Sequence, residues 1–302
     1  MKPWRSAVVA VVALAGCSVE LGPTEPWIDA ADLQGPMAPE VVEPPATMIG
    51  AWPTQIRVVS FNVEKGADVD GLAEVIRNNP GLAEGSILLL QEIESHPGEG
   101  GSRASRLAAA LGMGYVYAPE RTEGDGTHGP AILSRWPLSN VRTMKLPYAA
   151  LAISRAPRIA LAAEVWIGDQ VLNVIDLHLD TRLNVNQRVL QMRPAVLDAP
   201  WPTVVGGDLN MNPYVWIGDV VPQVPTNAAV DTDQAPMIDD YMRHIEYATP
   251  TALLGPTLRF GGVVDARLDA IYTRGVTSVP GEVERTVTIS DHWPLFIDVV
   301  LR

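Results

Sequence analysis

The sequence predicts an α/β sandwich built on mixed β-sheets, and three observations lead to this fold class. Eight short apolar runs have the length and composition of strands. Four longer segments repeat apolar residues at the spacing of an amphipathic helix and alternate with these runs. Two of the runs flank Gly168-Asp169, a two-residue hairpin signal. A hairpin joins antiparallel strands, so the sequence favours mixed sheets over a strictly parallel, doubly wound fold.

The expected elements follow one another from residue 56 onward. The predicted strands are Ile56–Val63, Ile87–Leu90, Ala131–Leu133, Arg158–Ile167, Val171–Leu177, Thr203–Val205, Leu268–Tyr272 and Leu295–Leu301. The predicted helices are Val69–Arg77, Ser102–Leu111, Asn186–Leu197 and Met237–Tyr247. The sequence contains no internal repeat and no low-complexity tract.

The composition is that of a globular, acidic protein. The chain has 302 residues, of which 47% are hydrophobic, enough for one large or two ordinary domains. Aromatic residues make up only 6%, so aliphatic side chains must supply most of the core. The net charge of −13 argues against tight, non-specific binding of nucleic acid, which needs a basic face. An enzyme that touches a few phosphates locally is still compatible with this charge.

The first residues predict an export signal. Lys2 and Arg5 precede an apolar segment, residues 7–15, that is too short to span a bilayer. The tetrapeptide LAGC, which ends at Cys17, resembles a bacterial lipobox, in which the signal is cut before a cysteine that then carries lipid. Cys17 is the only cysteine, and the alternative is an ordinary signal with a chance cysteine. The residue after the cysteine is Ser18 and not the aspartate that usually signals retention in the inner membrane, so the sequence favours an outer-membrane or cell-surface lipoprotein. Several acyl chains on one N-terminus would anchor the protein stably.

A stretch of unusual composition separates this signal from the folded region. Residues 18–54 contain seven prolines, six acidic residues and no lysine or arginine, which is typical of an extended tether. Within it, residues 27–33 are the part suited to fold locally or dock on the domain. The predicted organisation is a signal peptide over 1–16, a Pro/acidic-rich tether over 17–54 and one domain over 55–302.

The stretch GGDLNMNP follows a short apolar run and contains an Asp and an Asn two residues apart. If the strand continues, Asp208 and Asn210 point to the same side. A carboxylate beside a carboxamide is suited to hold a water or a phosphate oxygen near a metal. The ordinary alternative is a strand-to-turn junction, since Gly, Asp, Asn and Pro are common turn formers.

Other polar residues stand in equivalent places, at or beside the ends of predicted strands. They are Asn62, Glu92, His178, Asp269, Asp291 and His292. Side chains at several strand ends can meet at one rim, where sites are commonly built. Each has an ordinary reading alone: a turn for Asn62, an ion pair with Arg103 or Arg106 for Glu92, a core histidine for His178. Asp291 alone could cap a turn. Together they are harder to explain separately.

The order of these motifs resembles the endonuclease/exonuclease/phosphatase superfamily, which includes pancreatic-type deoxyribonuclease, apurinic endonucleases, neutral sphingomyelinases and inositol-polyphosphate phosphatases. The matching pieces are SFNVE, LLQEIE, HGPAILSRWPL, VIDLHLD, GGDLNMNP, LDAIYT and SDHWPL, from Ser60 to Leu295. The resemblance implies a four-layer α/β sandwich: two mixed, mainly antiparallel sheets packed face to face with helices outside. It implies an enzyme that hydrolyses phosphodiester or phosphomonoester bonds by in-line attack of water, with a divalent metal.

The resemblance also implies a role for each residue. Glu92 is the expected principal metal ligand, Asn62 supports the same site, and Asp291 lies near the cation. Glu64 stands where some members carry an aspartate near the metal. Asp208 and Asn210 position the attacking water and contact the phosphoryl group. His292 is the general base or the electrostatic partner of the phosphoryl oxygens, and Asp269 orients it. His178 donates to the phosphate or helps the leaving group, while Arg135 is a weaker phosphate-contact candidate and equally a structural ion-pair partner.

These roles imply cofactors and partners. Oxygen ligands favour Mg²⁺, with Mn²⁺ or Ca²⁺ as alternatives. The expected substrate is a phosphoester: nucleic acid, a phospholipid head group or a small molecule. The segment Met211–Ile217 either engages lipid as a hydrophobic hairpin or, as we prefer, packs ordinarily. The expected protein is a monomer held on a membrane through Cys17. The competing function is a non-catalytic surface lipoprotein that uses the same fold to bind a partner.

Overall fold

A computed structural model describes residues 27–28, 38–45, 53–149, 157–181, 183, 185–211, 216–217, 221–222, 234–260 and 264–300. The predicted signal, Cys17 and most of the Met211–Ile217 segment lie outside these residues. No helix in the described ranges is long and apolar enough to cross a membrane.

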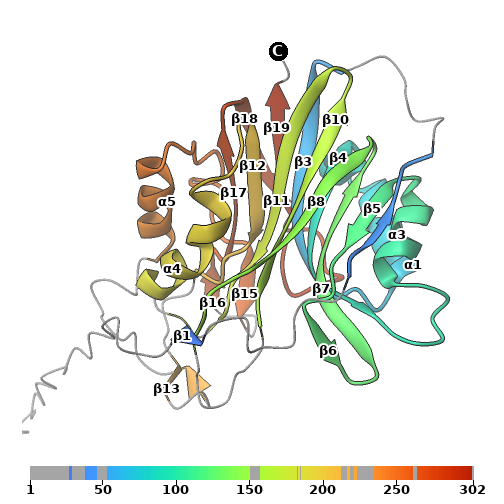
Figure 1. Cartoon of the computed structure of the whole chain (residues 1–302), viewed down its shortest axis with the longest axis horizontal. Helices are drawn as coiled ribbons and strands as arrows, with labels where there is room; N and C mark the ends of the chain where they lie inside the picture. The colour runs from blue at the N-terminus through green and yellow to red at the C-terminus, as the bar shows by residue number, and fades with distance from the viewer. Residues whose placement is uncertain are drawn as a thin grey trace, which may run out of the picture.

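Two β-sheets form the centre of the structure (Figure 1). The larger contains β2 (Glu40–Val42), β3 (Gln55–Lys65), β4 (Gly85–Ser95), β5 (Gly114–Tyr117), β6 (Arg121–Glu123), β7 (Gly126–Ser134), β18 (Thr277–Val283) and β19 (Leu295–Val300). Its strand order is β18-β19-β3-β4-β7-β5-β2, and β6 pairs with β7. The smaller contains β8 (Leu138–Lys145), β10 (Ile159–Ile167), β11 (Gln170–His178), β12 (Thr203–Asp208) and β17 (Asp269–Arg274). Its strand order is β17-β12-β11-β10-β8.

Both sheets are mixed and mainly antiparallel, as the sequence predicts. Among their described strands, β3 runs parallel to β4 and β11 runs parallel to β12. The predicted hairpin joins β10 to β11, and Ile167 pairs with Gln170 across its turn. Short two-stranded pairs accompany the sheets: β1 (Trp27–Ile28) with β9 (Tyr148–Ala149), β13 (Trp216–Ile217) with β14 (Val221–Pro222), and β15 (Leu258–Phe260) with β16 (Val264–Ala266).

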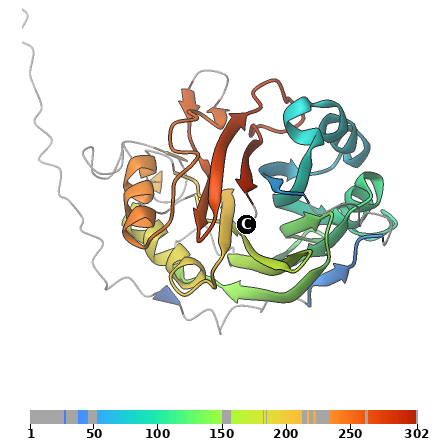
Figure 2. The ribbon, with the colours of Figure 1, turned by 90° about the horizontal axis from the view of Figure 1, so that it is seen from above.

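The sheets pack face to face and helices cover their outer faces, which confirms the four-layer sandwich (Figure 2). Helices α1 (Val69–Asn78), α2 (Pro80–Ala83) and α3 (Arg103–Leu111) lie against the larger sheet. Helices α4 (Val185–Val196) and α5 (Gln234–His244) cover the smaller one. One aliphatic core therefore fills the space between the sheets, and a further core lies under each helical layer.

The run ILLL in β4 shows why the central strands are apolar on both sides. Ile87 and Leu89 face the smaller sheet, whereas Leu88 and Leu90 face the helices. Successive side chains of a strand point to opposite faces, so a strand covered on both sides needs a continuous apolar run.

Part of the predicted tether belongs to the folded domain. Glu40–Val42 forms β2, the edge strand of the larger sheet, and pairs with Tyr115–Tyr117 of β5. Further upstream, Trp27 and Ile28 pair with Ala149 and Tyr148, so this piece docks on the chain downstream. The composition of residues 18–54 does not predict either pairing, because a short edge strand needs little apolar surface.

The two glycines before Asp208 are required by close packing. Gly207 has φ +150°, and an added Cβ would lie 1.8 Å from the carbonyl oxygen of Leu177 in the adjacent strand. At Gly206, an added Cβ would lie 2.7 Å from Leu89 in the opposite sheet. Only glycine fits where backbone or a facing sheet approaches this closely.

Candidate active site

Strand register brings the predicted residues to one end of the sandwich, the lower end in Figure 1. Asp208 pairs with His178 of β11 on one side and with Asp269 of β17 on the other. In the facing sheet, Asn62 pairs with Gln91, the residue before Glu92. His292 lies just before β19, in an isolated bridge to Leu258.

Irregular backbone aims several of these side chains. Glu92 and Asn210 have φ values of +62° and +50°, and Glu64 has +43°. The pairing of β4 with β7 shifts between Leu90 and Ile93, around Glu92. Bulges of this kind redirect side chains, and left-handed non-glycine residues cluster at functional sites.

Asp208 is the centre of the group. Its Oδ2 accepts a hydrogen bond of 3.1 Å from Asn62 Nδ2, and its Oδ1 accepts one of 2.8 Å from the backbone N–H of Asn210. His178 Nε2 lies 3.5 Å and His292 Nε2 lies 3.7 Å from Oδ2. Burial raises the pKa of Asp208 to about 7, although the charge of His292 acts in the opposite direction. The contact with the N–H of Asn210 is that of an ordinary turn, and Asn62 and the two histidines lie close to the same carboxylate.

His292 is held by the carboxylate that the family resemblance assigns to it. Its Nδ1 lies 2.9 Å from Asp269 Oδ2, which also accepts a hydrogen bond of 2.5 Å from Thr257 Oγ1. Burial lowers the pKa of His292, but the charges of Asp269 and Asp208 outweigh burial and raise the pKa to about 10. The ring is thus protonated at neutral pH when no cation is nearby.

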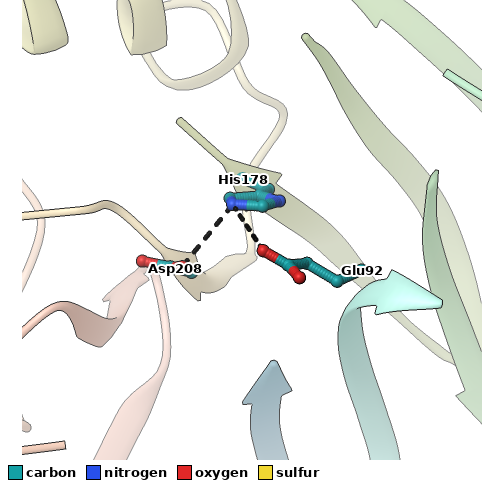
Figure 3. Close-up of side chains that lie close together, drawn as sticks. All are labelled: Glu92, His178 and Asp208. Carbon is teal, nitrogen blue, oxygen red and sulfur yellow. Dashed lines mark ion pairs between the residues drawn. The ribbon is translucent and has the colours of Figure 1, made fainter. Parts of the chain in front are cut away.

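His178 faces two carboxylates (Figure 3). Its Nε2 lies 3.6 Å from Glu92 Oε1 and 3.5 Å from Asp208 Oδ2, and its Nδ1 lies 2.9 Å from Arg158 NH1. Burial, together with the charge of Arg158, holds the pKa of His178 well below its usual value. His178 is buried, yet its polar contacts set it apart from an ordinary core histidine.

Two groups of side chains could hold a metal ion in the described part of the chain: Glu92, His178 and Asp208, and Asp208, Asp269 and His292. In each group the potential ligand atoms lie within 4.8 Å of one another. The second group is closed by the Asp269–His292 hydrogen bond. The first includes Glu92, whose carboxylate is only partly buried and reaches solvent. The oxygen donors of Glu92 and Asp208 suit a hard divalent cation.

Two further predicted residues join the group mainly through backbone contacts. The N–H of Asp291 donates to Glu64 Oε2 at 3.2 Å, while its exposed carboxylate accepts a long hydrogen bond of 3.4 Å from Ser290. Ser290, not Asp291, makes the local turn, because its Oγ accepts from the N–H of His292. Asn210 Nδ2 donates to the carbonyl of Leu179, so this amide ties the loop after His178 to the end of β12.

The structure differs from two expectations, those for Arg135 and Asn210, and it does not show the alternative ion pair of Glu92. Arg135 is not near the site: Ser134 pairs with Ile87 at the far end of β4, and the Arg135 guanidinium donates to the carbonyls of Gly85 and Ala83. The alternative partners of Glu92 are engaged elsewhere, since Arg103 pairs with Glu94 and Glu99, and Arg106 pairs with Glu99. Finally, the strand periodicity invoked for Asn210 does not apply, because β12 ends at Asp208.

Sequence reasoning missed the residues behind His178. Arg158 NH1 also lies 3.1 Å from Glu120 Oε1, and Glu120 accepts from Arg121 NH1 at 2.8 Å. His128 Nδ1 lies 3.3 Å from the same Glu120 oxygen. The sequence predicts only that Arg158 begins a strand, and its distance along the chain from Glu120 hides the pairing. No motif marks either residue as part of the site.

Comparisons with known proteins identify the family and related folds. The profile of the Endonuclease/Exonuclease/phosphatase family matches residues 59–292. A protein of that family from Leptotrichia buccalis C-1013-b has a similar structure, with 14% identity, a TM-score of 0.58, and 82% of this chain and 99% of that chain covered. No curated protein matches the chain by sequence.

Two other solved structures are similar in fold. The mannosyl-6-phosphatase of Bacteroides thetaiotaomicron VPI-5482 has 16% identity and a TM-score of 0.56, with 82% of this chain and 100% of that chain covered. A humanized D. rerio TDP2 has 17% identity and a TM-score of 0.54, with 82% and 99% covered. With the profile spanning both sheets and the residues that meet at their common end, the chain belongs to the endonuclease/exonuclease/phosphatase family.

Proposed function

We propose that this protein is a metal-dependent phosphoesterase that hydrolyses phosphodiester or phosphomonoester bonds by in-line attack of water. The observation that carries the proposal is Asp208, a buried carboxylate between two histidines. The Nδ1 atoms of the two histidines contact groups of opposite charge: Arg158 at His178 and Asp269 at His292. Packing of a structural core does not require two histidines with oppositely charged partners. Phosphoryl transfer does require a hydrogen-bond donor and a proton acceptor or cation around one phosphorus.

In this proposal the side chains divide the work. Asp208 accepts a proton from the attacking water or orients it, and Asn62 fixes the carboxylate by donating to Oδ2. Asn210 holds the loop that follows His178 in place. His292, oriented by Asp269, faces the phosphoryl oxygens as the general base or as a cation. His178 faces the same oxygens from the other side of Asp208.

Glu92 is the proposed principal metal ligand, with Asn62 and Asp291 close to the cation. When bound, a divalent cation neutralises negative charge that develops on the phosphoryl group. The residues fit such an ion, since Glu92 extends from a bulge toward Asp208 and retains access to solvent. Mg²⁺ is the proposed ion because the available donors are carboxylate and amide oxygens, with Mn²⁺ or Ca²⁺ as alternatives.

Replacing Glu92 by glutamine should raise the Mg²⁺ concentration needed for half-maximal activity by at least about tenfold, because even indirect changes at a metal site cost about 10–100-fold in affinity. Activity titrated against Mg²⁺ measures the effect. Glu84→Gln is a matched control, since Glu84 is 75% exposed and lies at the opposite end of the sheet. A wild-type enzyme that is indifferent to chelator would argue against any metal at this place.

The substrate class is proposed only at the level of a phosphoester. Extracellular nucleic acid, a phospholipid head group and small phosphoesters are the three candidates. The similar mannosyl-6-phosphatase adds weight to small phosphoesters, and the net charge of −13 weighs against extended, non-specific contact with nucleic acid. The assigned catalytic side chains are present and meet, which favours an enzyme over a surface protein that only binds a partner.

One assay tests the function. Residues 18–302 keep the β1 and β2 segments, which pair with the rest of the chain, and would be assayed with Mg²⁺. Bis-p-nitrophenyl phosphate reports phosphodiesterase chemistry, while DNA, RNA, sphingomyelin and small phosphomonoesters report substrate class. The His292→Ala chain serves as the blank. Hydrolysis that persists in the blank would point to a contaminant, and absence of hydrolysis with every substrate would contradict the proposal.

We also propose that the protein is exported and anchored to a membrane through lipid on Cys17. The proposed location is the outer membrane or the cell surface. The support is the LAGC tetrapeptide after a short apolar segment, together with the absence of any other cysteine from the sequence. Expression in a bacterial host with labelled palmitate should give a labelled, membrane-associated protein. Cys17→Ser should abolish the label and release the protein. Equal labelling of both forms would exclude Cys17 as the attachment site.

A further inference from the structure

Arg158 contacts His178 at the ring nitrogen that does not face the two carboxylates. The Arg158 side chain is 10% exposed, and its NH1 lies 2.9 Å from His178 Nδ1. The other ring nitrogen, Nε2, faces Glu92 and Asp208. The two nitrogens of His178 therefore have opposite surroundings, with a cation at Nδ1 and anions at Nε2.

The contact fixes which nitrogen carries the proton. A guanidinium has N–H donors, no acceptor, and keeps its proton under all ordinary conditions. Arg158 must therefore donate, and Nδ1 must accept with its lone pair. A neutral imidazole that accepts at Nδ1 carries its hydrogen on Nε2.

Glu120 keeps Arg158 in this position. Its side chain is 1% exposed, and its Oε1 accepts from Arg158 at 3.1 Å and from Arg121 at 2.8 Å. The backbone N–H of Glu120 donates to the carbonyl of His128 in β7, which fixes this residue to the sheet. A buried arginine requires such a counter-charge, because an unpaired buried cation is strongly unfavourable.

We propose that Arg158 is a positioning residue that holds His178 as its neutral, Nε2-protonated tautomer. Resting on the phosphoesterase function proposed above, this assigns His178 a single role: a hydrogen-bond donor to a phosphoryl oxygen. An Nε2 that carries hydrogen has no lone pair for a cation, so His178 is excluded as a metal ligand and Glu92 and Asp208 are left as the ligands of that group. Transfer of the same hydrogen to a leaving group would create an imidazolate, so His178 is also excluded as the general acid.

The tautomer can be measured directly, without relying on activity. Long-range ¹H–¹⁵N correlation spectra of the full chain labelled at histidine, with Cys17→Ser to prevent lipid attachment, distinguish a protonated from an unprotonated ring nitrogen. The chain has five histidines, and His178→Gln assigns the resonance of interest. We expect a protonated Nε2 and an unprotonated Nδ1 at neutral pH. A protonated Nδ1, alone or together with Nε2, would overturn the proposal.

Variants test whether Arg158 is the cause. Arg158→Met should mix the two tautomers and lower kcat by about 10–100-fold with little change in KM, somewhat less than the ~10²–10³-fold for deleting an oxyanion donor outright. Arg158→Lys, which can still donate, should restore the wild-type ring spectrum. Arg121→Met is the matched control: it removes another cation from Glu120 but does not contact His178, so the tautomer should not change.

The remaining outcomes are also decisive. If Arg158→Met does not fold, the Arg158→Met/Glu120→Gln double variant removes the charge of the buried carboxylate that has lost its Arg158 partner, and its ring spectrum replaces that of the single variant. An unchanged tautomer in a folded Arg158 variant would contradict the role of this arginine. A wild-type chain with the expected tautomer but no hydrolysis of any phosphoester would contradict the proposed function and leave the tautomer assignment standing.

Discussion

The His292→Ala chain is expected to hydrolyse phosphoesters about 10²–10⁴-fold more slowly than wild type, the range for loss of an acid–base group. His292 contacts both Asp269 and Asp208, so no neighbouring side chain can take over its position. Steady-state kinetics on bis-p-nitrophenyl phosphate measure the loss. His244→Ala is the matched control, because His244 is exposed at the end of α5. Near-normal turnover in His292→Ala would remove this residue from the proposed site.

The pH profile of the wild-type enzyme separates the two roles offered for His292. The charges of Asp269 and Asp208 raise its pKa to about 10 despite burial, so the ring is an imidazolium below that pH. If the His292 imidazolium stabilises the phosphoryl group, kcat falls as the pH rises through the pKa of His292. If the neutral ring is a general base, kcat rises instead, and a bound divalent cation moves the pKa to lower pH by charge repulsion.

The Asp269→Asn chain checks that this limb belongs to His292. Asparagine removes a negative charge that raises the pKa, so the limb should move to lower pH in either case. A limb that stays in place would assign it to another group.

Asp208→Ala should lower turnover by at least about a hundredfold, since Asp208 is the only carboxylate that contacts both site histidines among the described residues. Asp208→Asn sharpens the test. Its amide oxygen can still accept the hydrogen bond from the N–H of Asn210, while the charge that faces His178 and His292 is lost. We therefore expect Asp208→Asn to fold and to be nearly as inactive as the alanine variant.

Thermal unfolding provides the control for this pair. Burial raises the pKa of Asp208, which means that the ionised carboxylate is unfavourable in the fold. Asparagine removes this cost, but it turns an N–H donor toward Asn62 Nδ2 in place of the accepting Oδ2, so Asp208→Asn should unfold at or a little below the wild-type temperature in the absence of metal. An Asp208→Asn chain that is folded and fully active would show that the charge at this position has no part in the reaction.

The central strands could be predicted from sequence because they are covered on both faces and are therefore continuously apolar. In β4, the neighbours Ile87 and Leu88 face different cores, so each position along the strand must be apolar. Edge strand β17 is buried and was predicted, but exposed edge strands could not be predicted on this basis. Strand β8 is half-exposed and mostly polar, and β2 is a three-residue strand inside a proline-rich segment.

The site was predictable where residues stand directly at strand ends, as Asp208 and Asp269 do. It was not predictable where strand direction or backbone irregularity decides. Arg135 follows β7, which runs antiparallel to β4. The motif HGPAILSRWPL therefore begins near the site, and its arginine lies at the opposite end of the sandwich. The bulge at Glu92 depends on a left-handed glutamate, which no residue preference indicates. Arg158 and Glu120 meet only because separate segments of the chain bring them together.

Among the described residues, buried hydrogen bonds at this end of the sandwich join the smaller sheet to the larger one or to the loop that leads into it: Asn62 to Asp208, Gln91 to Asp176, and Asp269 with His292, just before β19. Neither sheet alone contains a complete set of reacting groups. A partly unfolded form in which the sheets have separated would keep much of its secondary structure and none of its turnover. Activity thus requires that the two sheets are docked, although the strands of the smaller sheet come from one continuous stretch, Leu138 to Arg274, between the strands of the larger one.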